Sequence, residues 1–408
     1  MKARTDQLPE QENSVKKSSP LKEAIINSIK NNVRQYTMIL ALLGIWIIFA
    51  VLTGAVFLNV RNLSNLFMQS ATVAIVGMGM VLIIVSGNID LSVGSVVGIT
   101  GAAIGALQVY GGWGTIPTIL LGLIIGVVIG LWQGYWVAYR GIPAFIVTLA
   151  SMLTLRGAVL GVTHGTTIAP LHKAFKAIGQ KYLPRLFFQE ASVHDTSLII
   201  TCVIILVYII LSVRRRQSRI RYGFKVISLP LEILKMAAVS LLMGFILYIM
   251  ISYRGIPYAI LVVIVVAVIL TFIANSTVFG RQIYAIGGNQ EAARLSGISI
   301  KKRLLMLFVL MGALTSVAGI VFTARLGAAT AQAGFMLELD AIAAAVIGGT
   351  SFSGGIGTIP GALVGAMVMA SLDNGMSLLN MDVTYQQIIK GLVLLLAVYV
   401  DTIFKTKK

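Results

Sequence analysis

The feature that most constrains this chain is the length of its uncharged, apolar runs. Apolar residues make up 57% of the 408 residues and charged residues only 11%, whereas charged residues account for about 25% of a typical soluble domain. A soluble protein of this length cannot bury so much apolar surface, because the buried fraction grows slowly with chain length. The composition excludes an ordinary cytosolic enzyme, a disordered chain and a nucleic-acid-binding module, and it predicts a chain embedded in lipid.

Many of the apolar runs are long enough to cross a membrane as a helix, which takes about 20 residues. We therefore predict an all-α, polytopic membrane protein with roughly ten to twelve transmembrane helices, some broken or re-entrant. The range stays open because two apolar regions are interrupted, residues 66–110 by 86–90 and residues 339–379 by 348–355. The uninterrupted runs are 38–57, 116–138, 143–163, 197–211, 236–253, 257–274, 304–323 and 388–400.

The basic residues predict the orientation of the chain in the membrane. There are 32 Lys and Arg against 14 Asp and Glu, a net charge of +18. Basic residues of polytopic membrane proteins collect in cytoplasmic loops, and with the N-terminus inside, 23 of the 32 fall in inner segments and 7 in outer segments. Both termini are therefore expected in the cytoplasm. The expected organisation is a cytoplasmic leader over 1–37, a membrane domain over 38–401 and a cytoplasmic tail over 402–408, with an outer loop at 164–196, a basic inner loop at 213–235 and a second inner loop at 276–302.

The two interruptions are candidates for a translocation path. Inside lipid, non-helical backbone is tolerated only where it is buried in protein or lines a wet cavity, and breaks in corresponding segments of a transporter point to its binding region. Alternatively, each break is an ordinary turn at the membrane interface. Asp90 also has two possible roles. It either faces a cavity, where it contacts a polar solute or couples a proton, or it serves to cap the following helix, a role that Asn88 could also fill. The candidate path residues are Asn88, Asp90, Ser92, Gly94, Gly348, Gly349, Gly354 and Gly355.

Motifs for catalysis, metal binding and nucleotide binding are missing from the sequence. The single cysteine, Cys202, excludes an internal disulfide or a Cys-rich metal site. The three histidines, His164, His172 and His194, lack the spacing of a metal site and are expected to be solvated. No phosphate-binding loop of the Walker type is present. We therefore expect no catalytic residue, no metal and no cofactor on this chain.

The inner loop 276–302 contains a short helix signal. Asn289 is a good N-cap, Glu291 falls in the first turn, where the helix dipole favours a carboxylate, and Gly297 ends the segment. A helix of about two turns is not stable alone in water. It must dock, either on its own bundle or in a groove of a cytoplasmic partner.

Four motifs occur in a fixed order along the chain. The first lies at 88–94, the second at 140–149, the third is the segment with Gly287, Gly288, Asn289, Glu291, Ala292, Ala293, Arg294 and Gly297, and the fourth runs from 338 to 355 and continues at 373–377 and 390–392. Together they resemble the permeases of bacterial ABC importers for ribose, xylose and galactose-type sugars, in which the third motif is the coupling segment. The likeness covers the chain from about Met38 to Asp401, and the run at 140–149 and the large loop 164–196 are most similar to xylose or multiple-monosaccharide permeases.

The resemblance implies a homodimeric transport subunit of the bacterial inner membrane. Two copies would pair with two ABC ATPase subunits inside, which would bind the ATP and Mg, while a sugar-binding protein outside would deliver the monosaccharide, by contact with loop 164–196. The coupling segment would sit in a groove of the ATPase. The partners implied are thus the ATPase, the binding protein, a second copy and the lipid bilayer, with no nucleic acid. The alternative is a secondary transporter driven by an ion gradient, which the scarcity of paired membrane carboxylates disfavours.

Overall fold

The computed structural model describes residues 38–187, 194–224, 226 and 228–406. The regular secondary structure of this part of the chain is entirely helical, and its only β-type pairings are two isolated bridges, Ile168 with Ala329 and Tyr182 with Pro257. The prediction of an all-α fold is confirmed. The expected leader, 1–37, and the last two residues of the expected tail lie outside the described residues.

Seven described helices are long and apolar enough to cross a membrane. Three shorter apolar helices join them, namely Met38–Leu52, α3 (Val93–Val109) and Val383–Tyr399, the described apolar part of α15 (Val383–Thr406). Two more, α13 (Leu337–Ile347) and α14 (Ile359–Leu378), flank the second break, so the bundle agrees with the expected ten to twelve spans. The seven are α2 (Val60–Val85), α4 (Thr115–Ala138), α5 (Ala144–Thr163), α7 (Asp195–Arg221), α8 (Leu229–Ile251), α9 (Tyr258–Ser276) and α12 (Ile300–Leu326).

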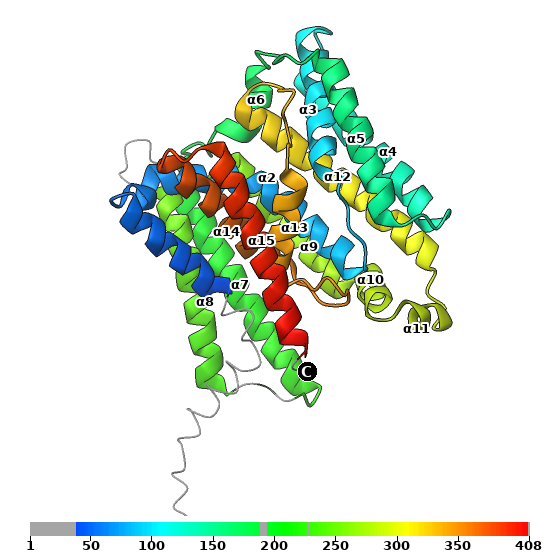
Figure 1. Ribbon diagram of the computed structural model, residues 1–408. Coiled ribbons are helices and arrows are strands. Elements are labelled where there is room, and N and C mark those ends of the chain that lie inside the picture. Colours follow the sequence, from blue (N-terminus) through cyan, green and yellow to red (C-terminus); the bar gives the residue numbers. More distant parts are fainter. Residues whose placement is uncertain (1–37, 188–193, 225, 227, 407–408) are drawn as a thin grey trace, which may run out of the picture.

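Helix α2 is the centre of the bundle. In its most apolar stretch of 18 residues, 89% of the residues are buried. The corresponding share is 22% for α4 and α5 and 17% for α7 and α8. It packs against α9, α12, α13 and α14, and Figure 1 shows it passing behind α13–α15. The outer helices leave their apolar side chains on the surface, as expected for helices in contact with lipid.

Two expected loops contain helices. Residues 213–221 of the basic segment continue α7, because arginine is a good helix former and the helix extends beyond its apolar run. An ion pair between Arg216 and Glu232 then ties α7 to α8. The outer loop includes α6 (Lys173–Gln180), which buries Phe175 and packs on α12 and α9. Figure 1 places α6 at the end of the bundle opposite α10 and α11.

The expectation that all three histidines are solvated is wrong for His194. This side chain is only 4% exposed. It occupies the N-cap of α7, where its Nδ1 lies 3.0 Å from the Ser197 hydroxyl, and its Nε2 lies 3.0 Å from the Leu183 carbonyl. The imidazole is buried because it satisfies polar groups at a helix start.

Glycines set the contact between α4 and α12. Gly126 faces Gly312 and Ser316 so closely that a Cβ on Gly126 would overlap the Gly312 carbonyl and the Ser316 hydroxyl. Gly130 meets the backbone of Phe308 in the same way. Small residues at such positions let membrane helices approach closely, and packing then holds them together.

We predict that Gly126→Leu lowers the thermal unfolding midpoint of the purified protein in detergent, by the equivalent of about 1–3 kcal/mol, because the added side chain separates α4 from α12. Gly157→Leu is the matched control, since Gly157 lies in the neighbouring span α5 with no atom within 4 Å of a built Cβ. Equal midpoints for the two variants would contradict the packing argument.

Candidate functional site

The first break is an extended segment that runs between helices of the bundle. After α2 ends at Val85, residues 86–92 connect it to α3 without helical structure (Figure 1). Its backbone is satisfied partly from α5, since the Leu91 amide donates to the Thr148 hydroxyl at 3.1 Å and that hydroxyl lies 3.4 Å from the Ile89 carbonyl. Protein groups thus replace the helical hydrogen bonds, which is the condition for non-helical backbone at membrane depth.

Asp90 is buried and bonds within its own segment. Its carboxylate accepts from the Ser92 amide at 2.8 Å and the Ser92 hydroxyl at 2.6 Å, while Gln133 of α4 donates to that hydroxyl at 2.7 Å. The helix begins at Val93, with Ser92 rather than Asp90 or Asn88 at its N-cap position. Asn88 turns back instead and donates to the Ser86 hydroxyl at 2.9 Å. Both side chains therefore shape the break.

The second break meets the first. Loop 348–358 joins α13 to α14, and the Gly355 amide donates to the Val85 carbonyl at 2.8 Å, where the first break starts. Gly349, Gly354 and Gly355 have φ values of 89°, 81° and 74°, a region that glycine adopts without strain. Gly348 instead packs against the backbone of Gly361 at the start of α14.

The segment after α9, which is expected on the inner side, contacts both breaks. It consists of α10 (Val278–Gly288) and α11 (Gln290–Leu295). A Cβ on Gly287 would overlap the Val85 carbonyl and lie 2.8 Å from the Gly355 amide nitrogen. Tyr284 adds a hydrogen bond from its hydroxyl to the Gly357 carbonyl at 2.7 Å, and burial raises the pKa of this tyrosine, so it stays a donor. We call this meeting of α10 with the two breaks the inner junction.

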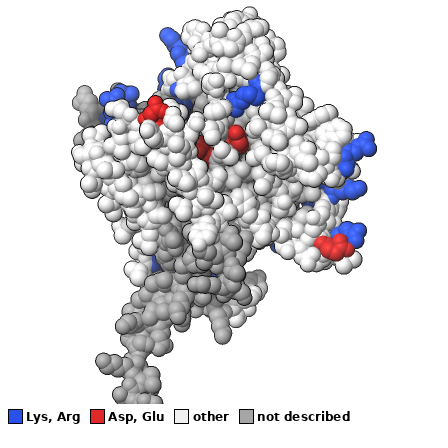
Figure 2. Space-filling model, viewed as in Figure 1, with Lys and Arg blue, Asp and Glu red and all other residues white. Residues whose placement is uncertain are grey.

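Helix α11 has the cap and the end expected from the sequence. Asn289 accepts from the Ala292 amide at 2.9 Å, and Gly297 follows the helix with φ of 79°. Ala293 packs inward, whereas the side chains of Glu291 and Arg294 form an exposed ion pair of 2.6 Å. Leu295 is 78% exposed. Figures 1 and 2 show α11 at a projecting corner, with an acidic and a basic group side by side.

Three motifs distant in the sequence line one cavity of about 400 Å³ beside the inner junction. The first break, the turn between α4 and α5 and the α10–α11 connection each contribute a wall. Sequence reasoning singled out the motifs but could not place them together, because nothing in their spacing reports tertiary contact. The lining includes Ser86, Gly87, Asn88, Gly141, Ile142, Pro143, Gly287, Gly288, Asn289 and Gln290.

The other candidate path residue, Gly94, lies away from the inner junction. It opens α3 against Gly334 and Glu338, where a Cβ would overlap the Gly334 carbonyl and the Glu338 carboxylate. Arg156 of α5 holds the same stretch, donating to the Ala333 carbonyl at 2.8 Å and the Gly334 carbonyl at 3.3 Å. The first break thus connects the inner junction to the loop 327–336.

A partly buried charge cluster was missed as a unit by sequence reasoning. Lys390 of α15 lies 3.0 Å from Asp340 of α13 and 2.8 Å from Asp373 of α14. In the sequence, Asp373 and Lys390 stand only in the continuations of the fourth motif, and no pairing between them was predicted. The available signal was that all three fall in or beside apolar runs, where ionisable residues are rare and pair with one another.

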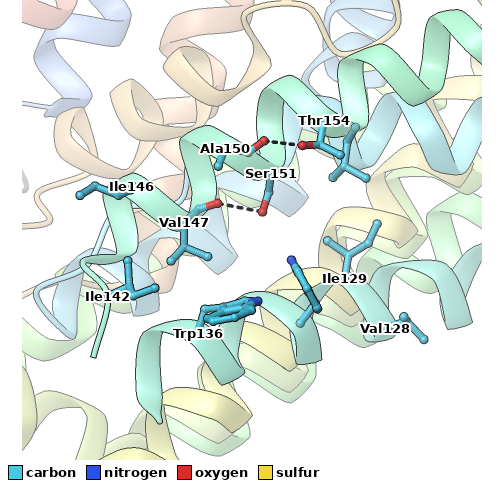
Figure 3. A pocket seen from close by; sticks show the side chains of 11 residues that line it. Val128, Ile129, Trp136, Ile142, Ile146, Val147, Ala150, Ser151 and Thr154 are labelled. Atoms are coloured by element: carbon cyan, nitrogen blue, oxygen red, sulfur yellow. Dashed lines mark hydrogen bonds between the residues drawn. The ribbon is translucent and has the colours of Figure 1, made fainter. Parts of the chain in front are cut away.

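Another cavity is an apolar groove between α4 and α5, with a volume of about 600 Å³ (Figure 3). Trp136 of α4 and Ile146 and Val147 of α5 line it. Its two hydroxyl groups bond within α5, Ser151 to the Val147 carbonyl at 2.8 Å and Thr154 to the Ala150 carbonyl at 2.9 Å. The groove therefore offers little to a polar solute. Across the described ranges, no three His, Cys, Asp or Glu side chains gather as a metal site.

Comparisons with known proteins agree with one another. Residues 62–398 match the family model described as branched-chain amino acid transport system / permease component. The chain is 40% identical to the xylose transport system permease protein XylH of Escherichia coli K12, over 92% of this chain and 93% of that protein. The Haemophilus influenzae XylH is also 40% identical, over 92% and 98%. The ribose import permease protein RbsC of Bacillus subtilis is 33% identical, over 88% and 91%. No solved structure matches significantly.

We predict that Gly287→Ala lowers the thermal unfolding midpoint by the equivalent of about 1–3 kcal/mol, because the methyl group forces α10 off the Val85 carbonyl. Gly288→Ala is the matched control one residue away, where a built Cβ meets no atom within 4 Å. Unfolding of the two purified variants followed side by side in detergent makes the comparison. A Gly287→Ala protein as stable as Gly288→Ala would contradict the close contact at the inner junction.

Proposed function

The chain belongs to the branched-chain amino acid transport system / permease component family, and from that membership we propose that it is the membrane subunit of an ATP-driven ABC importer for a monosaccharide. The sugar is xylose or a close relative, because the names of the similar proteins are xylose and ribose permeases. The observation that carries the proposal is the inner junction, where α10, which leads directly into the exposed helix α11, contacts both breaks in the bundle.

The energy source in this proposal is a separate ATPase. The chain has no phosphate-binding loop, so ATP and Mg bind to the partner subunit. Helix α11 presents Glu291, Arg294 and Leu295 outward while Ala293 holds it to the bundle. A short helix that leaves a leucine 78% exposed is suited to docking in a groove of a partner protein.

The contacts of α10 explain how a movement of the ATPase reaches the membrane helices. Tyr284 and Gly287 tie it to loop 348–358 and to the end of α2. A displacement of α11 therefore moves the starts of both breaks together. The non-helical segments are where α3 and α14 are free to change direction relative to α2 and α13, and such changes alternate the access of the path between the two sides.

The remaining expectations complete the proposed assembly. Two copies of the chain form the membrane unit in the bacterial inner membrane, with both termini in the cytoplasm. A sugar-binding protein delivers substrate to the outer end, where α6 lies. Affinity purification of the tagged chain from native membranes in mild detergent, followed by mass spectrometry, tests the assembly. A co-purifying ATPase with a phosphate-binding loop is the expected result, and a chain that transports sugar alone would contradict it.

We predict that Glu291→Lys abolishes sugar uptake while the protein stays in the membrane. The reversed charge breaks the pair with Arg294 and disturbs the α11 surface that docks on the ATPase. Uptake of radiolabelled D-xylose by cells, with membrane content measured on blots, is the assay. Asp382→Asn is the control, since it removes an acidic charge in the connection between α14 and α15, at the opposite end of the bundle, and keeps the side-chain oxygen that accepts from the Thr384 amide. Normal uptake by Glu291→Lys would contradict the coupling role.

The second candidate function is a secondary transporter driven by an ion gradient. The observation in its favour is the cluster of Lys390 with Asp340 and Asp373, since carboxylates paired within a membrane bundle serve proton coupling in some transporters.

We predict that collapse of the proton gradient with a protonophore, at constant internal ATP, leaves uptake running. Energy from ATP hydrolysis does not depend on that gradient. Uptake measured in vesicles loaded with ATP and an ATP-regenerating system makes the test, with vesicles lacking ATP as the control. Immediate loss of uptake on collapse of the gradient would favour the secondary transporter.

A further inference from the structure

A second cavity lies beside loop 327–336, on the far side of the bundle from the inner junction. Its volume is about 310 Å³, and five helices, α2, α12, α13, α14 and α15, form its walls with that loop. Figure 2 shows acidic side chains near the middle of this face, with basic ones close by, amid uncharged surface. The polar lining consists of Gln69, Thr72, Gln332, Asp340, Asp373 and Lys390, together with Arg325.

Two polar atoms in the lining of this cavity have no hydrogen-bond partner among the described residues. Thr72 of α2 is only 2% exposed, and its hydroxyl makes no hydrogen bond. A buried hydroxyl left unsatisfied costs about 1–3 kcal/mol. The Nε of Arg325, on α12, is likewise buried and unbonded within the described part of the chain. Unsatisfied groups that line a cavity point to a ligand that supplies the missing hydrogen bonds.

The charges that line the cavity sum to zero, and its carboxylates can still accept hydrogen bonds from a solute. Asp340 and Asp373 each place one oxygen on Lys390, and a carboxylate accepts several further hydrogen bonds. Two acidic and two basic residues line the cavity, which therefore carries no net charge. A neutral solute enters such a cavity without the electrostatic cost that an ion meets.

The side chains match one class of neutral solute. Sugar hydroxyls donate to carboxylates and accept from lysine, and amide and threonine side chains do both. Phe322 and Phe335, also in the lining, offer apolar surface to the C–H face of a sugar ring. The volume is at the lower limit of the range of about 300–1,000 Å³ typical of ligand pockets, which fits one small ring rather than an oligosaccharide.

The cavity is also connected to the inner junction. From Thr72 to Val85, helix α2 runs about 20 Å toward the first break, and α13 leads from Asp340 toward the second. We propose that this cavity is a sugar-binding subsite of the chain itself, in which the Thr72 hydroxyl and the Asp340–Lys390–Asp373 cluster hold the monosaccharide between delivery and release. This inference rests on the proposed sugar transport and adds to it a defined binding site within the membrane bundle.

The test compares two threonine variants in the complete transporter, reconstituted with its ATPase and its binding protein in liposomes. Thr72→Val removes the unpartnered hydroxyl at nearly constant volume, so the unfolding midpoint should stay unchanged or rise. Thr154→Val makes the same change in the apolar groove of α5, outside the cavity. Uptake of radiolabelled D-xylose and ATP hydrolysis are measured on the same preparation.

We expect Thr72→Val to lower uptake about fivefold, the effect of one hydrogen bond worth about 1 kcal/mol, and to raise the ATP hydrolysed per sugar moved. Thr154→Val should match the wild type in both. Thr72→Leu, which also fills the cavity, should reduce uptake further. Wild-type uptake by Thr72→Val, with an unchanged ratio of ATP to sugar, would overturn the subsite while leaving sugar transport intact. A wild-type complex that moves no D-xylose or D-ribose with ATP would instead overturn the proposed function.

Discussion

The whole structure depends on one requirement, that every backbone N–H and C=O inside the bilayer has a partner in the protein. Helices meet it within themselves, and the two breaks meet it only because other segments surround them. Thr148 of α5 supports the first break, and the Val85 carbonyl accepts from Gly355 of the second. The glycines at these points allow the backbones to approach closely enough for such bonds. The central position of α2 follows, since its inner end must contact both breaks and α10.

Local features could be predicted from the sequence because neighbouring residues determine them. The apolar runs predicted the helical fold, the polar and Gly-rich interruptions predicted both breaks, and Asn289 and Gly297 predicted the limits of α11. Features that depend on tertiary packing could not be predicted. The pairing of Lys390 with Asp340, 50 positions away, and the burial of His194 both depend on where helices meet. The helical state of 213–221 was missed because its charge was taken as a loop signal.

The inner junction and the second cavity differ in the contacts that their named residues make. At the inner junction, Tyr284 has its carbonyl partner and the glycines pack backbone against backbone, so the parts move as one body. At the other cavity, Thr72 and Arg325 keep unbonded polar atoms and the aspartates have spare capacity. Rigid contact suits the transmission of a movement, and unsatisfied hydrogen-bonding groups suit transient contact with a polar solute. The proposed transport cycle needs both properties, at separate places.

The hairpin of α7 and α8 has a consequence for how this kind of protein evolves. Its two helices have the least buried apolar windows of the seven long helices, 17% each, and the Arg216–Glu232 pair joins them to each other. A peripheral element of this kind contributes little to the central packing around α2. Selection on this hairpin requires mainly that its side chains are compatible with lipid. Substitutions between species should therefore concentrate in the hairpin, while α2, α10 and the breaks stay nearly constant.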